Sequence, residues 1–108
     1  MKDTPTSINP QAPYVVKVDP IVAPLVPDYL KNREKDLHKL TEALAAKDFA
    51  VLRKVGHNIR GSAGAYGLPP LSAIAARIED AAQAQDAAPI GPALEDMRLF
   101  LLNVKFVP

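Results

Sequence analysis

Apolar positions recur every three or four residues over most of the chain, which is the spacing of one face of an α-helix. The pattern predicts four helices, over about residues 27–47, 48–66, 69–85 and 89–104. The second stretch has the clearest apolar seam, with successive spacings of three and four: Phe49, Leu52, Gly56, Ile59, Ala63 and Tyr66. Four amphipathic helices with short connections predict an all-α fold, an antiparallel up-down four-helix bundle.

The N-terminal residues follow a different pattern. Six of the eleven prolines lie within the first 27 residues, and each proline removes a backbone donor and fixes φ. We therefore predict an extended or disordered arm over residues 1–18 and a single domain over residues 19–108. The apolar segment 14–18 has no evident partner strand, so no strand pair is predicted. Asp19 is a favoured N-cap residue and Pro20 is favoured at the first helical position, so this pair predicts a short turn before the first helix.

Composition narrows the classes of function. Thirteen basic and twelve acidic residues give a net charge of +1, too small to predict nucleic acid or an anionic membrane as the partner. The chain has no cysteine, which excludes disulfides, thiolate metal sites and cysteine nucleophiles. No apolar run reaches the roughly 20 residues of a membrane span, and no signal peptide is recognisable. We expect a cytoplasmic monomer.

One short segment concentrates unusual residues. The stretch "GHNIRGSAGAYG", residues 56–67, holds four of the five glycines and one of the two histidines. A glycine inside an exposed helix costs about 0.8–1 kcal/mol relative to alanine, so each one needs a reason. Gly56 lies on the apolar seam, where it allows close approach of another helix. Gly67 fits the left-handed position that ends a helix.

The histidine of this segment is predicted to face solvent. At 100° per residue, His57 lies about 130° from the centre of the seam. Gly61 and Gly64, four and seven residues on, border it and leave space for a bulky group or another protein. Arg60, three residues on, is placed to hold an anion near the ring. The alternative is that Gly61 and Gly64 only fray the helix end.

These residues resemble the phosphorylation motif of histidine-containing phosphotransfer (Hpt) domains. The resemblance covers about residues 20–104, and the matching positions are His57, Ile59, Arg60, Gly61, Ser62, Ala63, Tyr66 and Gly67. Arg60 departs from the commoner lysine but keeps the charge. On the third helix, where relatives often carry polar donors, the candidates are Glu79 and Gln83. Glu79 is an acceptor near a phosphate dianion, so no role is assigned to it.

The resemblance implies a phosphorelay intermediate. His57 would accept a phosphoryl group from a receiver-domain aspartate, or from a kinase, and pass it to another receiver-domain aspartate. Arg60 would be the charge partner, and Gly61 and Gly64 would give access to the ring. The expected partners are response-regulator receiver domains and a hybrid histidine kinase. Mg²⁺ would come from the receiver, with no cofactor of the chain's own, and the absence of a nucleotide-binding motif argues against kinase activity.

Two alternatives remain open at the level of sequence. The bundle could be a non-catalytic module that docks a kinase or response regulator through the same face, although the histidine at position 57 favours transfer. The second histidine, His38, lies in a charged helical segment without a companion ligand and is interpreted as a solvated surface residue. A metal site in the core is not predicted, because inward Glu and Glu-x-x-His residues are missing.

Overall fold

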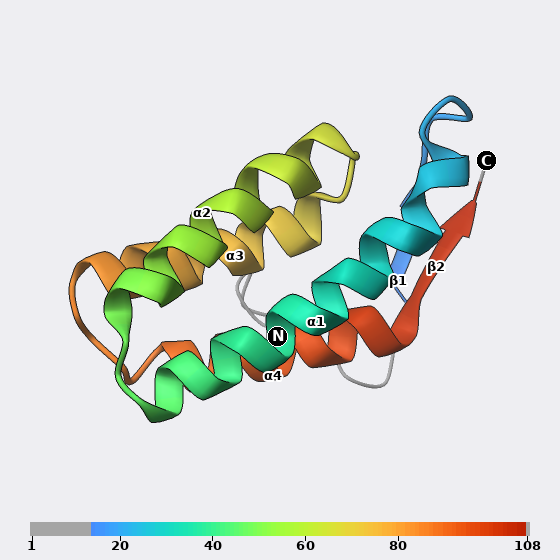
Figure 1. Ribbon diagram of the computed structural model, residues 1–108. Helices are drawn as coiled ribbons and strands as arrows, with labels where there is room; N and C mark the ends of the chain where they lie inside the picture. The colour runs from blue at the N-terminus through green and yellow to red at the C-terminus, as the bar shows by residue number, and fades with distance from the viewer. Residues whose placement is uncertain (1–13, 108) are drawn as a thin grey trace, which may run out of the picture.

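Four helices pack side by side into a bundle in which each helix contacts two others. The computed structural model describes residues 14–107 (Figure 1). Its helices are α1 (Val26–Ala45), α2 (Phe49–Ala65), α3 (Pro69–Gln83) and α4 (Ile90–Asn103), preceded by a 3₁₀ turn, η1 (Ala23–Leu25). Each helix contacts the next one along the chain, α4 closes the ring on α1, and α2 and α3 form the most extensive pair. This is the four-helix bundle that the sequence predicts.

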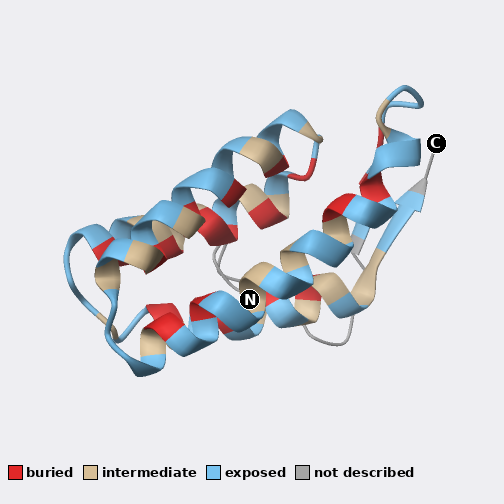
Figure 2. Cartoon of the chain, viewed as in Figure 1, coloured by how far each residue is buried: buried red, intermediate tan, exposed pale blue. Residues whose placement is uncertain are grey.

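The apolar faces of the four helices meet along the axis of the bundle. Figure 2 shows buried residues on the inward sides of the helices and exposed residues outside. The predicted seam of α2 is inside, because Leu52, Gly56, Ile59 and Ala63 are all buried. The largest fully buried side chains come from all four helices and the turn before α3: Leu40, Leu52, Ile59, Leu68, Leu71, Ile74, Ile78, Ile90, Met97 and Phe100.

The helix ends follow local hydrogen-bonding rules. Asp48 caps α2, its carboxylate accepting from the Val51 backbone N–H at 3.2 Å. Gly67 ends α2 with a φ of 74°, and the Leu68 N–H reaches back to the Ala63 carbonyl at 2.8 Å. The ends of α1 and α3 use the same arrangement, with non-glycine residues in the left-handed position: Lys47 and Gln85.

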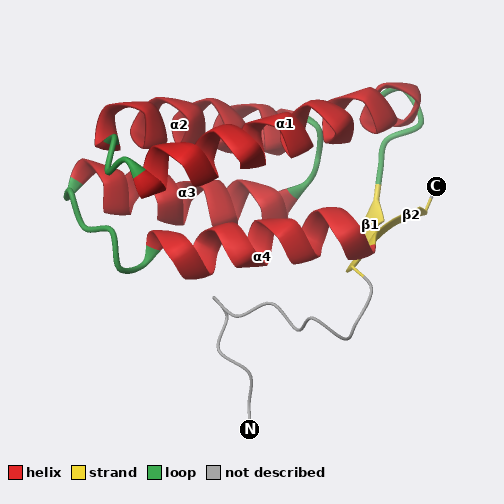
Figure 3. Cartoon of the chain, turned by 60° about the horizontal axis from the view of Figure 1, so that its bottom comes forward, coloured by secondary structure: helices red, strands yellow, loops and turns green. Residues whose placement is uncertain are grey.

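A small sheet joins the two ends of the described chain. Strand β1 (Tyr14–Lys17) pairs in parallel with β2 (Val104–Val107), with Tyr14 opposite Val104. Figure 3 shows both strands at one end of the bundle, beyond the last turn of α4. The expectation that no strand pair forms is therefore wrong, because the partner of the N-terminal segment comes from the other end of the chain. Residues 1–13 of the predicted arm lie outside the described residues.

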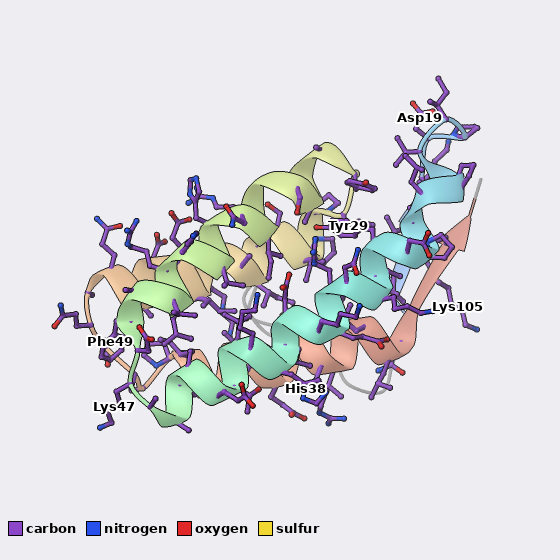
Figure 4. The ribbon with its side chains drawn as sticks, viewed as in Figure 1. Asp19, Tyr29, His38, Lys47, Phe49 and Lys105 are labelled. Carbon is purple, nitrogen blue, oxygen red and sulfur yellow. The ribbon has the colours of Figure 1, made fainter. Side chains whose placement is uncertain are left out.

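An aromatic contact ties the glycine-rich end of α2 to α1. The rings of Tyr29 and Tyr66 stack with centroids 4.2 Å apart, and the Tyr29 hydroxyl is 2.7 Å from Ser62 Oγ. The guanidinium of Arg33 lies over the Tyr29 ring at 4.4 Å. Figure 4 places Tyr29 toward this end of the bundle and Phe49, the first residue of α2, at the opposite end. These contacts hold the C-terminal end of α2 against α1.

Candidate functional site

His57 lies in the middle of α2 with its ring in solvent. Its side chain is 69% exposed, whereas its neighbour Gly56 is buried against α3. This is the orientation that the spacing of the apolar seam predicts, because the two residues are 100° apart around the helix. The imidazole is therefore open to a second protein.

Glu79 of α3 bridges the histidine and the arginine of the motif. His57 Nδ1 is 2.8 Å from Glu79 Oε2, and Arg60 Nη1 donates to Glu79 Oε1 at 3.2 Å. The Glu79 side chain is only 12% exposed, while that of Arg60 is 52% exposed. A largely covered carboxylate thus uses one oxygen for each of two exposed partners.

These contacts settle which nitrogen of His57 carries a proton. The hydrogen bond from His57 lowers the pKa of the Glu79 carboxyl below its ordinary value of 4.5, and Arg60 adds to the lowering against the opposing effect of desolvation. An ionised carboxylate can only accept, so Nδ1 must be the donor. In the neutral ring Nε2 then keeps its lone pair, and no described residue hydrogen-bonds to it.

Gly56 permits the contact between the two helices. A Cβ at this position would lie 3.1 Å from the backbone nitrogen of Glu79 and 3.3 Å from the carbonyl oxygen of Ala75. Both neighbours are backbone atoms of α3, which cannot move aside as a flexible side chain could. The absence of a side chain therefore brings the backbone of α3 at Glu79 directly against α2, one residue from His57.

Gly61 and Gly64, the two glycines that follow His57 within α2, border open space. A Cβ at Gly61 would meet no other atom within 4 Å, and one at Gly64 would meet only Ser72 Oγ at 3.9 Å. The Ser72 hydroxyl in turn donates to the backbone carbonyl of Arg60 at 2.9 Å, so it joins the start of α3 to α2. The helix surface on the C-terminal side of His57 therefore carries no side chain at Gly61 or Gly64 that would block a partner.

The comparison with known families bears on this arrangement directly. The Hpt domain family model matches residues 25–105, which include all four helices and the site. The chain belongs to the Hpt family. No curated protein and no solved structure matches the chain. Membership in the family implies phosphotransfer in a phosphorelay, in which Hpt domains interact with receiver domains or kinases.

Glu79 is the site residue that sequence reasoning missed in this Hpt domain. The sequence places it on the third helix near the histidine, but its acceptor character near a phosphate dianion argued against a role. In the structure the Glu79 carboxylate contacts Nδ1 of His57 and makes no hydrogen bond with Nε2, the other ring nitrogen. A signal was present in the sequence, since Gly56 predicts close approach of another helix, but the register of α3 against α2 was needed to use it.

Gln83 and His38 lie outside this constellation. Gln83 is exposed one helical turn beyond Glu79 and, among the described residues, makes no hydrogen bond to His57. His38, labelled in Figure 4, is exposed on α1 and not on the α2–α3 hairpin. Over residues 14–107, no three His, Cys, Asp or Glu side chains gather as metal ligands, and none of the helices is long and apolar enough to cross a membrane.

Proposed function

We propose that this Hpt domain carries the phosphoryl group on Nε2 of His57, accepting it from an aspartyl phosphate of one receiver domain, or from a kinase, and passing it to an aspartate of another. The observation that supports this most directly is the 2.8 Å contact between Nδ1 and Glu79, because it fixes the proton on one nitrogen and leaves the other nucleophilic. The high exposure of the ring lets the phosphorus of a second protein reach Nε2.

The transfer step follows from this tautomer. The Nε2 lone pair attacks the phosphorus of the aspartyl phosphate, and an N–P bond forms while the P–O bond to the aspartate breaks. The aspartate carboxylate leaves with the bonding electrons. The ring keeps its Nδ1 proton and becomes a phosphoimidazolium, whose positive charge develops beside the Glu79 carboxylate. In the return step a receiver carboxylate attacks the same phosphorus, and the neutral imidazole leaves.

Arg60 serves as the charge partner of the transferred group. It gives one N–H to Glu79 at 3.2 Å, and a guanidinium has five N–H donors in all. Within the described residues no other side chain accepts from Arg60. Its remaining donors are therefore available to phosphoryl oxygens, while its bond to Glu79 holds the guanidinium beside the ring. Gly61 and Gly64 keep the approach to Nε2 open.

The receiver domain supplies the remaining chemistry. Phosphoryl transfer depends mainly on positioning and on stabilising charge around the transferred group. In this proposal the Mg²⁺ that neutralises the phosphoryl oxygens arrives with the receiver, held by that domain's carboxylates. The Hpt domain contributes an oriented nucleophile and one cation.

The experiment is transfer of ³²P from a phosphorylated receiver domain, with a panel of receivers as donors. Wild-type protein and His38→Gln should become labelled, and His57→Gln should not. His38 is the matched control, because it is the other exposed histidine. Isolated labelled protein should then pass the label to a second, unlabelled receiver. Label retained by His57→Gln would contradict the proposal.

A further inference from the structure

A shallow groove lies beside the phosphorylation site. It has a volume of about 250 Å³ and is formed by the first turns of α2, the last turn of α3 and Gln85, the second residue after α3. The lining residues are Phe49, Ala50, Arg53, Ala82, Gln83 and Gln85. Arg53 precedes His57 by one helical turn, and Gln83 follows Glu79 by one turn, so the groove continues the face that carries the site.

The size of a protein interface places this groove under a docked partner. A standard interface covers about 800 Å² of each protein, which corresponds to a disc roughly 16 Å in radius. Arg53 lies about 6 Å and Phe49 about 12 Å from His57 along the axis of α2, at a rise of 1.5 Å per residue. A receiver centred on the His57 ring therefore reaches the whole groove.

The groove has a mixed lining: Phe49, Ala50 and Ala82 form an apolar side that fits a small apolar side chain, and Arg53, Gln83 and Gln85 form a polar side that fits a carboxylate next to it. Its floor includes Ala82, which is buried, and Phe49, which is partly buried. Arg53 is exposed at the rim and forms no ion pair with any residue in 14–107. Arg60, on the same face, is already paired with Glu79. Among the described residues Arg53 thus has no ion-pair partner, and it lies beside the apolar side of the groove.

Charge points to the same class of partner. Arg53, Lys54 and Arg60 lie within one turn of His57 on α2, and Glu79 balances only one of them. The domain that delivers the phosphoryl group holds Mg²⁺ and therefore has carboxylates around its own reacting aspartate. A basic face beside His57 complements an acidic rim on that domain, which speeds encounter and fixes orientation.

We propose that this groove is a specificity pocket for the receiver domain, taking an apolar side chain of the receiver while Arg53 pairs with a receiver carboxylate. The proposal rests on the proposed function, since it assumes that a receiver docks over His57. It assigns the groove to recognition and not to chemistry. Changes there should alter how tightly the receiver binds and leave the transfer step itself nearly unchanged.

Two substitutions test the pocket from different directions. Ala50→Leu fills the hollow with a good helix former, and Arg53→Glu reverses the charge at its rim. The matched controls are Ala45→Leu and Lys39→Glu, which make the same changes at exposed positions of α1. Circular dichroism and thermal unfolding establish that each variant is folded.

The measurement is single-turnover transfer from the best phosphorylated receiver of a panel, at increasing receiver concentration. Labelling with phosphoramidate, a donor too small to need docking, normalises each preparation for the fraction of His57 able to carry phosphate. In each pocket variant the receiver concentration for half-maximal transfer should rise at least tenfold, with the maximal rate within threefold of wild type. The two α1 controls should match wild type.

Three results would overturn the pocket. One is an unchanged half-maximal concentration in both variants, and another is a loss confined to the maximal rate. The third is a concentration-dependent dimer that Ala50→Leu abolishes while receiver affinity stays the same, which would assign the groove to a second copy of the chain. Failure of the wild-type protein to take label on His57 from any donor would overturn the proposed function itself, and so is distinguishable from these.

As a positive check, single carboxylates on the receiver surface are changed to lysine and paired with Arg53→Glu. One such receiver variant should bind Arg53→Glu at least fivefold more tightly than the unchanged receiver does. The same variant should bind the wild-type Hpt domain more weakly than the unchanged receiver does. If none of the receiver's surface carboxylates behaves in this way, the ion pair assigned to Arg53 is wrong.

Discussion

At the scale of single residues, the site depends on which edge of the imidazole meets the carboxylate. A carboxylate beside a phosphoryl group would repel it, but Glu79 contacts Nδ1, and the proposed phosphorylated atom is Nε2. Glu79 is therefore placed to stabilise the positive charge of the ring without facing the phosphoryl oxygens. The same carboxylate holds Arg60, so one residue of α3 positions two residues of α2.

The Glu79 pair should be visible in the pH dependence of stability. Because the folded-state pKa of Glu79 is lowered, the ionised carboxylate contributes stability above pH 4.5 that is lost as the pH falls through the folded-state value. Glu79→Gln should therefore be less stable than wild type at pH 7, and the difference should shrink toward pH 3. Urea unfolding at a series of pH values measures this difference in stability. Phosphoryl transfer by Glu79→Gln at pH 7 should also be slower by about tenfold, because a charge-assisted hydrogen bond to His57 is lost.

Glu95 provides the matched control. Its pKa is also lowered, through a hydrogen bond from Arg98, but the pair lies on α4. Glu95→Gln should show a stability change in the same pH range, reduced by solvent screening, and transfer at the wild-type rate. Equal slowing of transfer in both variants would mean that Glu79 acts only through overall stability.

At the scale of helices, the α2–α3 contact distinguishes two glycines of the same segment. Gly61→Ala should stabilise the protein by about 1 kcal/mol, because alanine is the better helix former and the added Cβ meets open space. Gly56→Ala gains the same propensity but pushes a Cβ against the α3 backbone at 3.1 Å, and overpacking typically costs about 1–3 kcal/mol. We expect a net loss of about 1 kcal/mol, measured by urea unfolding. Equal stabilisation by both substitutions would show that α3 can move away freely.

The sequence predicted helices well because their signals are local. Apolar spacing, with Gly67 at the end of the second helix, places the bounds of all four helices within about two residues of those observed. The left-handed residues Lys47 and Gln85 were not predictable, since neither residue type favours that conformation. At both positions the next backbone N–H bonds back to the helix, from Asp48 to Ala43 and from Asp86 to Ala81, and the residue type at the turn does not signal this contact.

At the scale of the whole molecule, two features needed the assembled structure. The β1–β2 pair joins segments about ninety residues apart, and Val104 continues the apolar spacing of α4, so the sequence extends that helix through it. The link from Glu79 to His57 depends on the register of α3 against α2. Periodicity gives the face of each helix, but the axial offset between two helices follows from side-chain packing at the contact.

The sheet should be the least protected part of the described chain. It consists of two four-residue strands, whereas α2 and α3 share an extensive buried contact. Local opening requires little free energy where few buried apolar contacts are lost. In hydrogen exchange, amides of β1 and β2 should exchange at least a hundredfold faster than those around Leu52, Ile59 and Ile78. Equal protection throughout would show that the strands open only when the whole bundle unfolds.

The parallel pairing of the two ends also has a consequence for the order in which the protein is made. The segment that brings His57 and Glu79 together, residues 49–83, is contiguous and is synthesised before any residue of β2 exists. Contacts between neighbouring helices need only short loops to close, whereas the strand pair must close almost the entire chain and bears the larger entropy loss. On a ribosome the helices of the phosphotransfer face can therefore begin to pair while the C-terminal strand is still inside the exit tunnel. The sheet is the last element that can form, after the site is already assembled.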